Sequence, residues 1–297
     1  MNSKFVGVYA VVVTPFFKDG RFDFDSAKKH IDWLIEKGVH GLCILGATGE
    51  YQSITDEEHK EYVETIVPYV NHRVPVIVGV SRERPDDVVD LMNHDAKYGA
   101  DACMALSPFY CHPAQDEIVA FYQYLSDHTN IPFVVYNNPG SAGVNIEPAT
   151  YRKLLSIPRA AIVKESTGEI QRLTEVVNEA PETTSVFCGC DTLAFESFAS
   201  GACGWISMGA NFAPQDCVAI FDAVCKEKDY AKARDIYRRI LPLLELLETF
   251  PKPVQVNKYI VKHYCGLESG YVRRHRLELT NNEIAYVEKL ASSIEFR

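Results

Sequence analysis

Apolar and polar positions divide the chain into short apolar runs and longer amphipathic stretches. Residues 7–14 and 41–45 are apolar runs of strand length, whereas residues 27–36 and 56–67 repeat apolar positions at the helical spacing. This order predicts consecutive βα units. Further strands are predicted at residues 75–80, 102–106, 133–136, 160–164, 185–188 and 203–207, with helical patterns between and after them.

The predicted strands are typical of a closed parallel barrel. The run Val76-Ile77-Val78 is apolar throughout, as expected for a parallel sheet covered on both faces. Eight βα units in roughly 225 residues favour a (β/α)8 TIM barrel over a doubly wound sheet. No GxGxxG motif follows an early strand, which also disfavours a dinucleotide-binding fold.

After Asp229 the pattern becomes purely helical, over residues 231–249, 254–264 and 281–294. Pro251 and Pro253 mark the first break, and residues 266–270 mark the second. We therefore expect a barrel catalytic domain at residues 1–226 and a C-terminal helical domain at residues 227–297.

Composition excludes several classes of protein. With 47% hydrophobic residues and a formal charge of −10, the 297-residue chain can bury a large core but has no basic strip for nucleic acid. No apolar segment approaches the roughly 18 residues that span a membrane. The nine cysteines form no CxxC pair and lie mostly in apolar runs, so we expect a cytoplasmic protein. Cys188 and Cys190 flank Gly189, but no second Cys/His pair stands at ligand spacing, so we expect no metal.

Barrel enzymes place their chemistry where strands run into the βα loops, and four predicted strand ends stand out. They are Gly46-Ala47-Thr48-Gly49-Glu50, Ser107-Pro108-Phe109-Tyr110, Tyr136-Asn137-Asn138-Pro139 and Val163-Lys164-Glu165-Ser166.

Lys164 closes an apolar strand at residues 160–163 and is the candidate nucleophile. Burial favours a neutral amine, so we expect a lowered pKa, as an imine-forming lysine requires. The alternative is that Lys164 pairs with Glu165 or another acid and only stabilises the barrel.

The turn at residues 46–49 offers backbone N–H groups suited to a carboxylate, and Thr48 adds a hydroxyl. The alternative is a plain glycine-rich βα turn. Tyr136 and Tyr110 each offer a phenol for proton transfer near an imine, although either could simply pack at the rim. Glu50 is expected to support its loop by hydrogen bonds.

Taken together, these segments resemble the dihydrodipicolinate synthase and N-acetylneuraminate lyase family of class I aldolases. The resemblance covers nearly the whole chain: Thr14-Pro15-Phe16, residues 46–50, 107–110, 136–139, 164–166 and 189–191, and Ile206-Ser207.

The resemblance implies that pyruvate-like 2-oxo acids form an imine with Lys164 while Thr48 and the amides of the turn hold the carboxylate. Tyr136 would act as acid and base, and Tyr110 is similar to the tyrosine that members lend across a dimer interface. The usual assembly is a homotetramer, a dimer of dimers. No metal or organic cofactor is expected, because the protonated imine is itself the electron sink. The implied substrate-binding residues are Gly46, Ala47, Thr48, Gly49, Asn138, Ser141, Gly189, Asp191 and Ser207.

Two departures concern the synthase reaction. Ala47 stands where well-known members carry a Thr or Ser whose hydroxyl joins two tyrosines in a proton relay, so that relay cannot be complete. Ser141 stands where synthases carry an arginine that holds the carboxylate of aspartate semialdehyde, and serine cannot replace that clamp.

Two further departures concern sialic acid lyases, because Thr192 and Met208 replace a Glu and a Ser that bind sugar hydroxyls.

The remaining interpretation is a catabolic aldolase, dehydratase or deaminase acting on a 2-keto-3-deoxy sugar acid or a hydroxyproline-derived pyrroline carboxylate. The alternatives are 4-hydroxy-tetrahydrodipicolinate synthase, N-acetylneuraminate lyase and a catalytically silent oxo-acid-binding regulator. A phosphate-binding barrel is disfavoured, because residues 209–212 make a poor phosphate cup.

Overall fold

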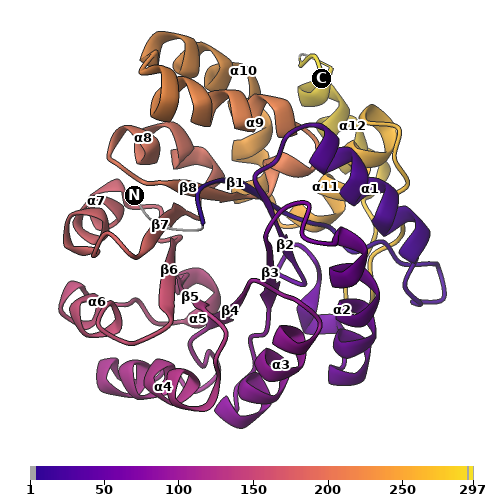
Figure 1. Cartoon of the computed structure of the whole chain (residues 1–297). Coiled ribbons are helices and arrows are strands. Elements are labelled where there is room, and N and C mark those ends of the chain that lie inside the picture. The colour runs from indigo at the N-terminus through magenta and orange to yellow at the C-terminus, as the bar shows by residue number, and fades with distance from the viewer. Residues whose placement is uncertain (1–4, 293, 297) are drawn as a thin grey trace.

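The computed structural model describes residues 5–292 and 294–296, in which eight parallel strands close into a barrel in sequence order (Figure 1). Strand β1 pairs with both β2 and β8, which completes the ring. The predicted (β/α)8 barrel is confirmed. The strands are β1 (Gly7–Val11), β2 (Gly41–Ile44), β3 (Val76–Gly79), β4 (Ala102–Leu106), β5 (Phe133–Asn137), β6 (Ala160–Glu165), β7 (Ser185–Cys188) and β8 (Gly204–Ser207).

Helices surround the barrel, as Figure 1 shows. The outer α-helices are α1 (Phe24–Glu36), α2 (Asp56–Val70), α3 (Pro85–Lys97), α4 (Gln115–His128), α5 (Pro139–Ala142), α6 (Pro148–Leu154), α7 (Ile170–Glu179), α8 (Ala194–Ala199) and α9 (Pro214–Phe221). Three single 3-10 turns also occur, η1 (Tyr51–Ser53), η2 (Asp191–Leu193) and η3 (Gly209–Asn211), and a π-helix, η4 (Asp222–Glu227), continues from α9. The predicted alternation holds, with two helices, α5 and α6, between β5 and β6.

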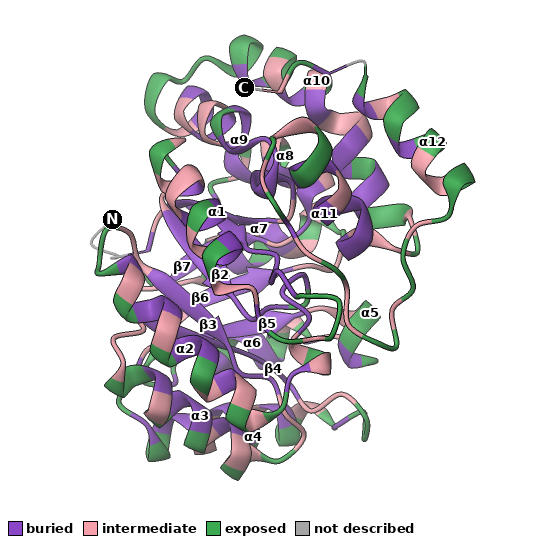
Figure 2. Cartoon of the chain, turned by 90° about the vertical axis from the view of Figure 1, so that its right-hand side faces the viewer, coloured by how far each residue is buried: buried purple, intermediate pink, exposed green. Residues whose placement is uncertain are grey.

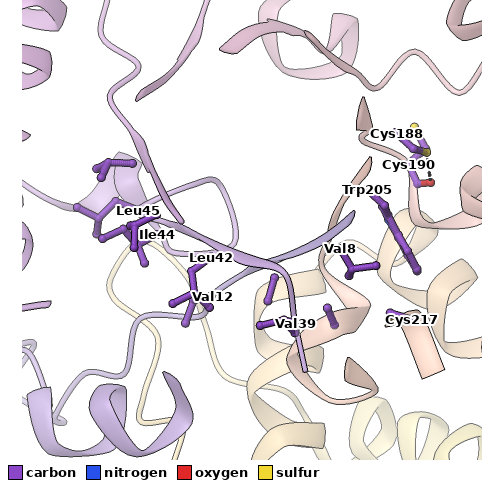
Figure 3. Packing of buried hydrophobic residues seen from close by; sticks show 14 of the residues in the cluster. Val8, Val12, Val39, Leu42, Ile44, Leu45, Cys188, Cys190, Trp205 and Cys217 are labelled. Carbon is purple, nitrogen blue, oxygen red and sulfur yellow. Dashed lines mark hydrogen bonds between the residues drawn. The ribbon is translucent and has the colours of Figure 1, made fainter. Parts of the chain in front are cut away.

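The strands are buried on both faces, which explains their continuous apolar sequences. Along β1, Val8 and Ala10 belong to the layer between strands and helices, whereas Tyr9 and Val11 belong to the barrel interior. Figure 2 shows buried strands enclosed by helices whose exposed residues face outward. Figure 3 shows part of the outer layer, where Val8 and Trp205 lie near Cys217.

Two aromatic rings fill the end of the barrel where strands begin. Tyr9 and Phe187 lie with ring centroids 5.2 Å apart. A Cβ at Gly41 would come within 2.1 Å of Tyr9, and one at Gly204 within 2.0 Å of Phe187. Side chains therefore fill this end, and the barrel opens for chemistry at the other end, where the strands finish.

The C-terminal extension consists of α10 (Tyr230–Thr249), α11 (Pro253–Tyr264) and α12 (Asn281–Ala291). Its Leu244 and Ile260 belong to the same apolar cluster as the barrel helices. The segment after α11 returns to the first βα loop, where the Tyr271 N–H donates to the Phe16 carbonyl at 2.9 Å. The division into domains 1–226 and 227–297 stays a prediction, and residue 293, within the last predicted helix, lies outside the described residues. Within the described chain, no helix is long and apolar enough to cross a membrane.

Candidate active site

Strand register brings Lys164 and Tyr136 together. Lys164 on β6 pairs directly with Tyr136 on β5. The Lys164 Nζ lies 4.2 Å from the centroid of the Tyr136 ring and is hydrogen-bonded to that residue. Only 6% of Lys164 is exposed. The next residue, Glu165, engages a different set of groups and accepts a hydrogen bond from the Tyr151 hydroxyl at 2.6 Å. The structure thus favours the interpretation of Lys164 as a barrel-mouth amine over its pairing with Glu165.

The charge on Lys164 depends on its neighbours. Burial lowers the pKa of Lys164, as the sequence predicts. Negative charge on Tyr136, Cys43 and Asp191 acts in the opposite direction and prevails, so the pKa of Lys164 is raised above its ordinary value. The predicted net lowering is therefore wrong for the free site. Lys164 must lose a proton before it can attack a carbonyl, and the Tyr136 phenol is a titratable group beside it.

The glycine-rich turn after β2 forms one wall of a small cavity. Gly46, Ala47, Tyr51, Tyr136 and Ser141 line this cavity together. Four of the predicted site residues, Gly46, Ala47, Tyr136 and Ser141, are thus among the eleven residues that line the cavity.

Buried contacts anchor this turn. Thr48 is buried, and the Gly49 carbonyl accepts a hydrogen bond from the Thr14 hydroxyl at 2.8 Å. The buried carboxylate of Glu50 accepts from the Lys258 ammonium at 2.6 Å and from the Arg273 N–H at 3.0 Å. Glu50 supports its loop as expected, through residues of the C-terminal extension.

Asn138 gives Tyr136 a second polar neighbour. The Asn138 Nδ2 donates to the Tyr136 hydroxyl at 2.8 Å. Its Oδ1 accepts from the Ser141 N–H at 3.2 Å, which caps the short helix α5. Asn138 therefore orients the Tyr136 phenol, and Tyr136 and Ser141 both line the cavity.

The ends of β7 and β8 place a carboxylate on the other side of Lys164. Asp191 accepts from the Ser207 hydroxyl at 2.6 Å and the Met208 N–H at 3.0 Å. Burial, together with negative charge on Glu248, raises the pKa of Asp191 to about 7. Gly189 lies against the stem of Lys164, because a Cβ there would come within 2.9 Å of the Lys164 Cε. Gly189, Asp191 and Ser207 are thus all near the candidate nucleophile.

Glu248 at the end of α10 is a candidate that the sequence analysis missed. Its Oε1 accepts from the Asp191 N–H at 2.7 Å. Glu248 is exposed as a residue, but partial burial of its carboxyl group raises its pKa, while the hydrogen bond from the Asp191 N–H and the positive charge of Lys164 act in the opposite direction. No local motif marks Glu248 within the helical tail. Tyr51 also lines the cavity but was not predicted as a site residue, although it directly follows Glu50 in the predicted loop.

Tyr110, a predicted site residue, lies away from the cavity of Tyr136 within the single chain. Its side chain is 87% exposed, and its backbone N–H donates to the Glu83 carboxylate at 2.9 Å. It does not line the cavity of Tyr136. A role for Tyr110 therefore depends on a second subunit, which stays a prediction.

Residues 5–292 and 294–296 contain no candidate metal site, because no three His, Cys, Asp or Glu side chains among them lie close enough to bind one ion. The Cys188 thiol donates to the Cys190 carbonyl at 3.1 Å, and both side chains pack in the outer core (Figure 3). These cysteines therefore act as small buried residues.

Comparison with known proteins adds independent findings. The model of the dihydrodipicolinate synthetase family matches residues 4–294. The 4-hydroxy-tetrahydrodipicolinate synthase of Methanocaldococcus jannaschii is 35% identical over 293 residues, which cover 98% of this chain and 99% of the relative. The enzyme of that name from Syntrophotalea carbinolica is 33% identical over 290 residues, 97% of each chain.

Solved structures agree. A dihydrodipicolinate synthase from Bacillus anthracis is similar with a TM-score of 0.93 at 27% identity, over 98% of this chain and 99% of that one. The chloride-inhibited dihydrodipicolinate synthase from Acinetobacter baumannii, complexed with pyruvate, is similar with a TM-score of 0.91 at 27% identity, over 97% and 98% of the two chains.

Proposed function

Because this chain belongs to the dihydrodipicolinate synthetase family, whose members are Schiff-base-forming lyases, we propose that Lys164 forms an imine with the keto carbon of a pyruvate-like 2-oxo acid. The observation that carries this proposal is the buried, hydrogen-bonded pair of Lys164 and Tyr136. Tyr136 takes a proton from the ammonium and returns one to the hydroxyl that leaves as the imine forms. The relative that is complexed with pyruvate supports the choice of substrate class.

The turn at residues 46–49 is the proposed carboxylate site. It follows the carboxyl end of β2, and Gly46 and Ala47 line the cavity that also contains Tyr136. Backbone N–H groups and the hydroxyl of Thr48 would hold the carboxylate beside the reacting carbonyl. The anchored Glu50 keeps this turn rigid before substrate binds.

The far half of the substrate is proposed to be small and hydroxylated, or a cyclic imine acid. Ser141 lines the cavity and offers only a neutral hydroxyl. A second carboxylate on the substrate would need a cationic side chain, such as arginine, to bind it at this position. The pKa of Asp191 is raised to about 7, and the pKa of Glu248 is also raised above its ordinary value, so each carboxyl group holds a proton more readily than a free side chain. Such groups can protonate a departing oxygen or nitrogen, as elimination or carbon–carbon cleavage requires. We propose a catabolic dehydratase, aldolase or deaminase on this basis.

A second candidate is 4-hydroxy-tetrahydrodipicolinate synthase, which condenses pyruvate with aspartate semialdehyde. The names of the relatives at 33% and 35% identity favour it. Ser141 argues against it, because loss of a charged bidentate contact typically reduces specificity by about a hundredfold or more.

The imine at Lys164 and the identity of the substrate can both be tested on one preparation of the protein. Borohydride with pyruvate should add one pyruvate-derived mass to the peptide containing Lys164, and Lys164→Ala should not trap. A label elsewhere would refute the imine assignment. Specificity constants should then be compared for 2-keto-3-deoxygluconate, pyrroline-4-hydroxy-2-carboxylate, N-acetylneuraminate and aspartate semialdehyde with pyruvate. A dominant rate with aspartate semialdehyde would establish the synthase instead, and trapping without any turnover would indicate a silent oxo-acid-binding regulator.

We also propose that the protein is cytoplasmic. The nine cysteines are all free thiols, and eight of them are buried or partly buried. Unpaired thiols in this number are typical of a reducing compartment.

A further inference from the structure

A second cavity, with a volume of about 390 Å³, lies at the end of the barrel where the strands begin. Val6, His40 and Cys203, which line it, directly precede β1, β2 and β8. Its apolar walls include the buried rings of Phe198 from α8 and Phe221 from α9, two helices that pack together outside the barrel (Figure 1). A cavity of this size, lined mainly by apolar groups and by a few polar ones, is typical of small-molecule sites.

His40 supplies one polar group of defined orientation. Its Nδ1 accepts a hydrogen bond from the Val8 N–H at 3.1 Å, which places the proton of the neutral ring on Nε2. Burial and the positive charge of Lys226 lower the pKa of His40, while negative charge on Asp222 acts in the opposite direction, so the ring is neutral at neutral pH. Nε2 has no hydrogen-bond partner among the described residues. His40 therefore offers an N–H donor to the cavity that it lines.

The charged side chains that line the cavity are cations. They are Lys226 and Lys228, and no Asp or Glu lines the cavity in the part of the chain that the structure describes. Lys226 is paired with Asp222 at 2.7 Å, whereas Lys228 forms no ion pair with a described residue. Burial raises the pKa of the Cys225 thiol to about 11, and the positive charge of Lys228 acts against this rise, so the ammonium lies close to the cavity. This local positive charge, in a chain of formal charge −10, favours an anion.

We propose that this cavity binds a small monocarboxylate with an apolar body. The carboxylate accepts a hydrogen bond from the His40 Nε2–H and pairs with the Lys228 ammonium. The apolar body packs against Phe198 and Phe221. The site lies at the opposite end of the barrel from the candidate nucleophile, so this inference does not depend on the proposed imine.

The test is calorimetric titration of the full-length protein with 3-phenylpropionate, 3-phenylpropanol and 3-phenylpropylamine. These probes share one apolar body and differ in the charge of the end group. We expect saturable binding of the carboxylate with a Kd below about 1 mM, binding of the alcohol weaker by roughly tenfold or more, and no binding of the amine.

Two variants assign the contacts of the carboxylate. His40→Asn keeps an acceptor for the Val8 N–H but loses the Nε2 donor, so it should weaken binding of 3-phenylpropionate by roughly tenfold to a hundredfold. Lys228→Asn suits the left-handed backbone at φ 60° and should weaken binding by about twofold to fivefold, as for an exposed ion pair. Lys18→Asn removes an exposed charge from the first βα loop and is the matched control, which should bind like the wild type.

Alkylation locates the bound probe. Cys225 lines the cavity and is partly buried, so 3-phenylpropionate should slow its reaction with N-ethylmaleimide. Cys265 is the internal control, because it is also partly buried and burial raises its pKa to about 12. Its thiol donates to the Phe212 carbonyl at 3.5 Å, outside this cavity, so its rate of alkylation should not change.

Four outcomes would overturn the proposal. The first is equal affinity for the amine and the carboxylate, and the second is carboxylate binding without protection of Cys225. The third is wild-type affinity in Lys228→Asn and in a folded His40→Asn; if His40→Asn does not fold, Lys228→Asn decides. The fourth is a Cys225 that does not react without the probe while Cys265 reacts, which would show that another part of the protein or a second copy covers the cavity.

Discussion

Substitution of Gly189 by alanine tests whether the site depends on close packing against Lys164. The new Cβ would lie 1.9 Å from the Ser166 Oγ and 2.9 Å from both Cε and Cγ of Lys164. The backbone at Gly189 is not in the left-handed region, so the cost is steric rather than conformational. The buried Ser166 hydroxyl has no hydrogen-bond partner and can rotate away, whereas the lysine stem must retreat by about 0.5 Å to reach ordinary contact.

The magnitude follows from these contacts. Overpacking of this kind costs about 1–3 kcal/mol of folding free energy, which lowers Tm by about 2–4 °C per kcal/mol in a chain of this size. A misplacement of about 1 Å at a reacting group can cost a hundredfold, so we expect imine formation in Gly189→Ala to slow by roughly tenfold to a hundredfold. Thermal unfolding and the rate of borohydride trapping with pyruvate measure the two effects separately.

A double variant distinguishes loss of fold from loss of site. Ser166→Ala removes the 1.9 Å contact, so Gly189→Ala/Ser166→Ala should regain stability while Lys164 stays displaced and labelling stays slow. Labelling of Gly189→Ala at the wild-type rate would show that the position of the lysine stem does not limit the reaction, and the reasoning would fail.

Three further predictions concern other parts of the molecule. Glu50→Gln should lower the free energy of unfolding by about 3–5 kcal/mol in chemical denaturation, because it leaves Lys258 buried without its carboxylate. Lys258→Met in that background should recover part of the loss, and an unchanged denaturation midpoint in Glu50→Gln would contradict this reasoning. Because the pKa of Asp191 is raised to about 7, its carboxyl is protonated below that pH, so elimination should slow as pH rises through about 7 while imine trapping does not. A Glu248→Gln variant with an unshifted pH profile would argue against an effect of Glu248 on the pKa of Asp191. The exposed Tyr110 should become buried by self-association, so sedimentation at micromolar concentration should show a homotetramer or at least a dimer, and a fully active monomer would exclude this.

The sequence was sufficient for the barrel and for the first group of site residues. Apolar runs of strand length alternating with amphipathic stretches allow few folds, and the carboxyl ends of parallel strands must meet at one rim. Lys164 and Tyr136 were therefore predictable as neighbours without coordinates, and the β-sheet register places them directly side by side.

Tertiary structure decided the electrostatics and the contributions of distant segments. The pKa of Lys164 could not be predicted from its apolar strand, because Tyr136 and Asp191 approach it from neighbouring strands and outweigh the effect of burial. Glu248 reaches Asp191 across 57 positions of sequence. The sequence pattern shows which side chains face the core, because that depends on local periodicity. The charge on a buried group depends on the sum of interactions with every nearby group, and only the folded chain brings those groups together.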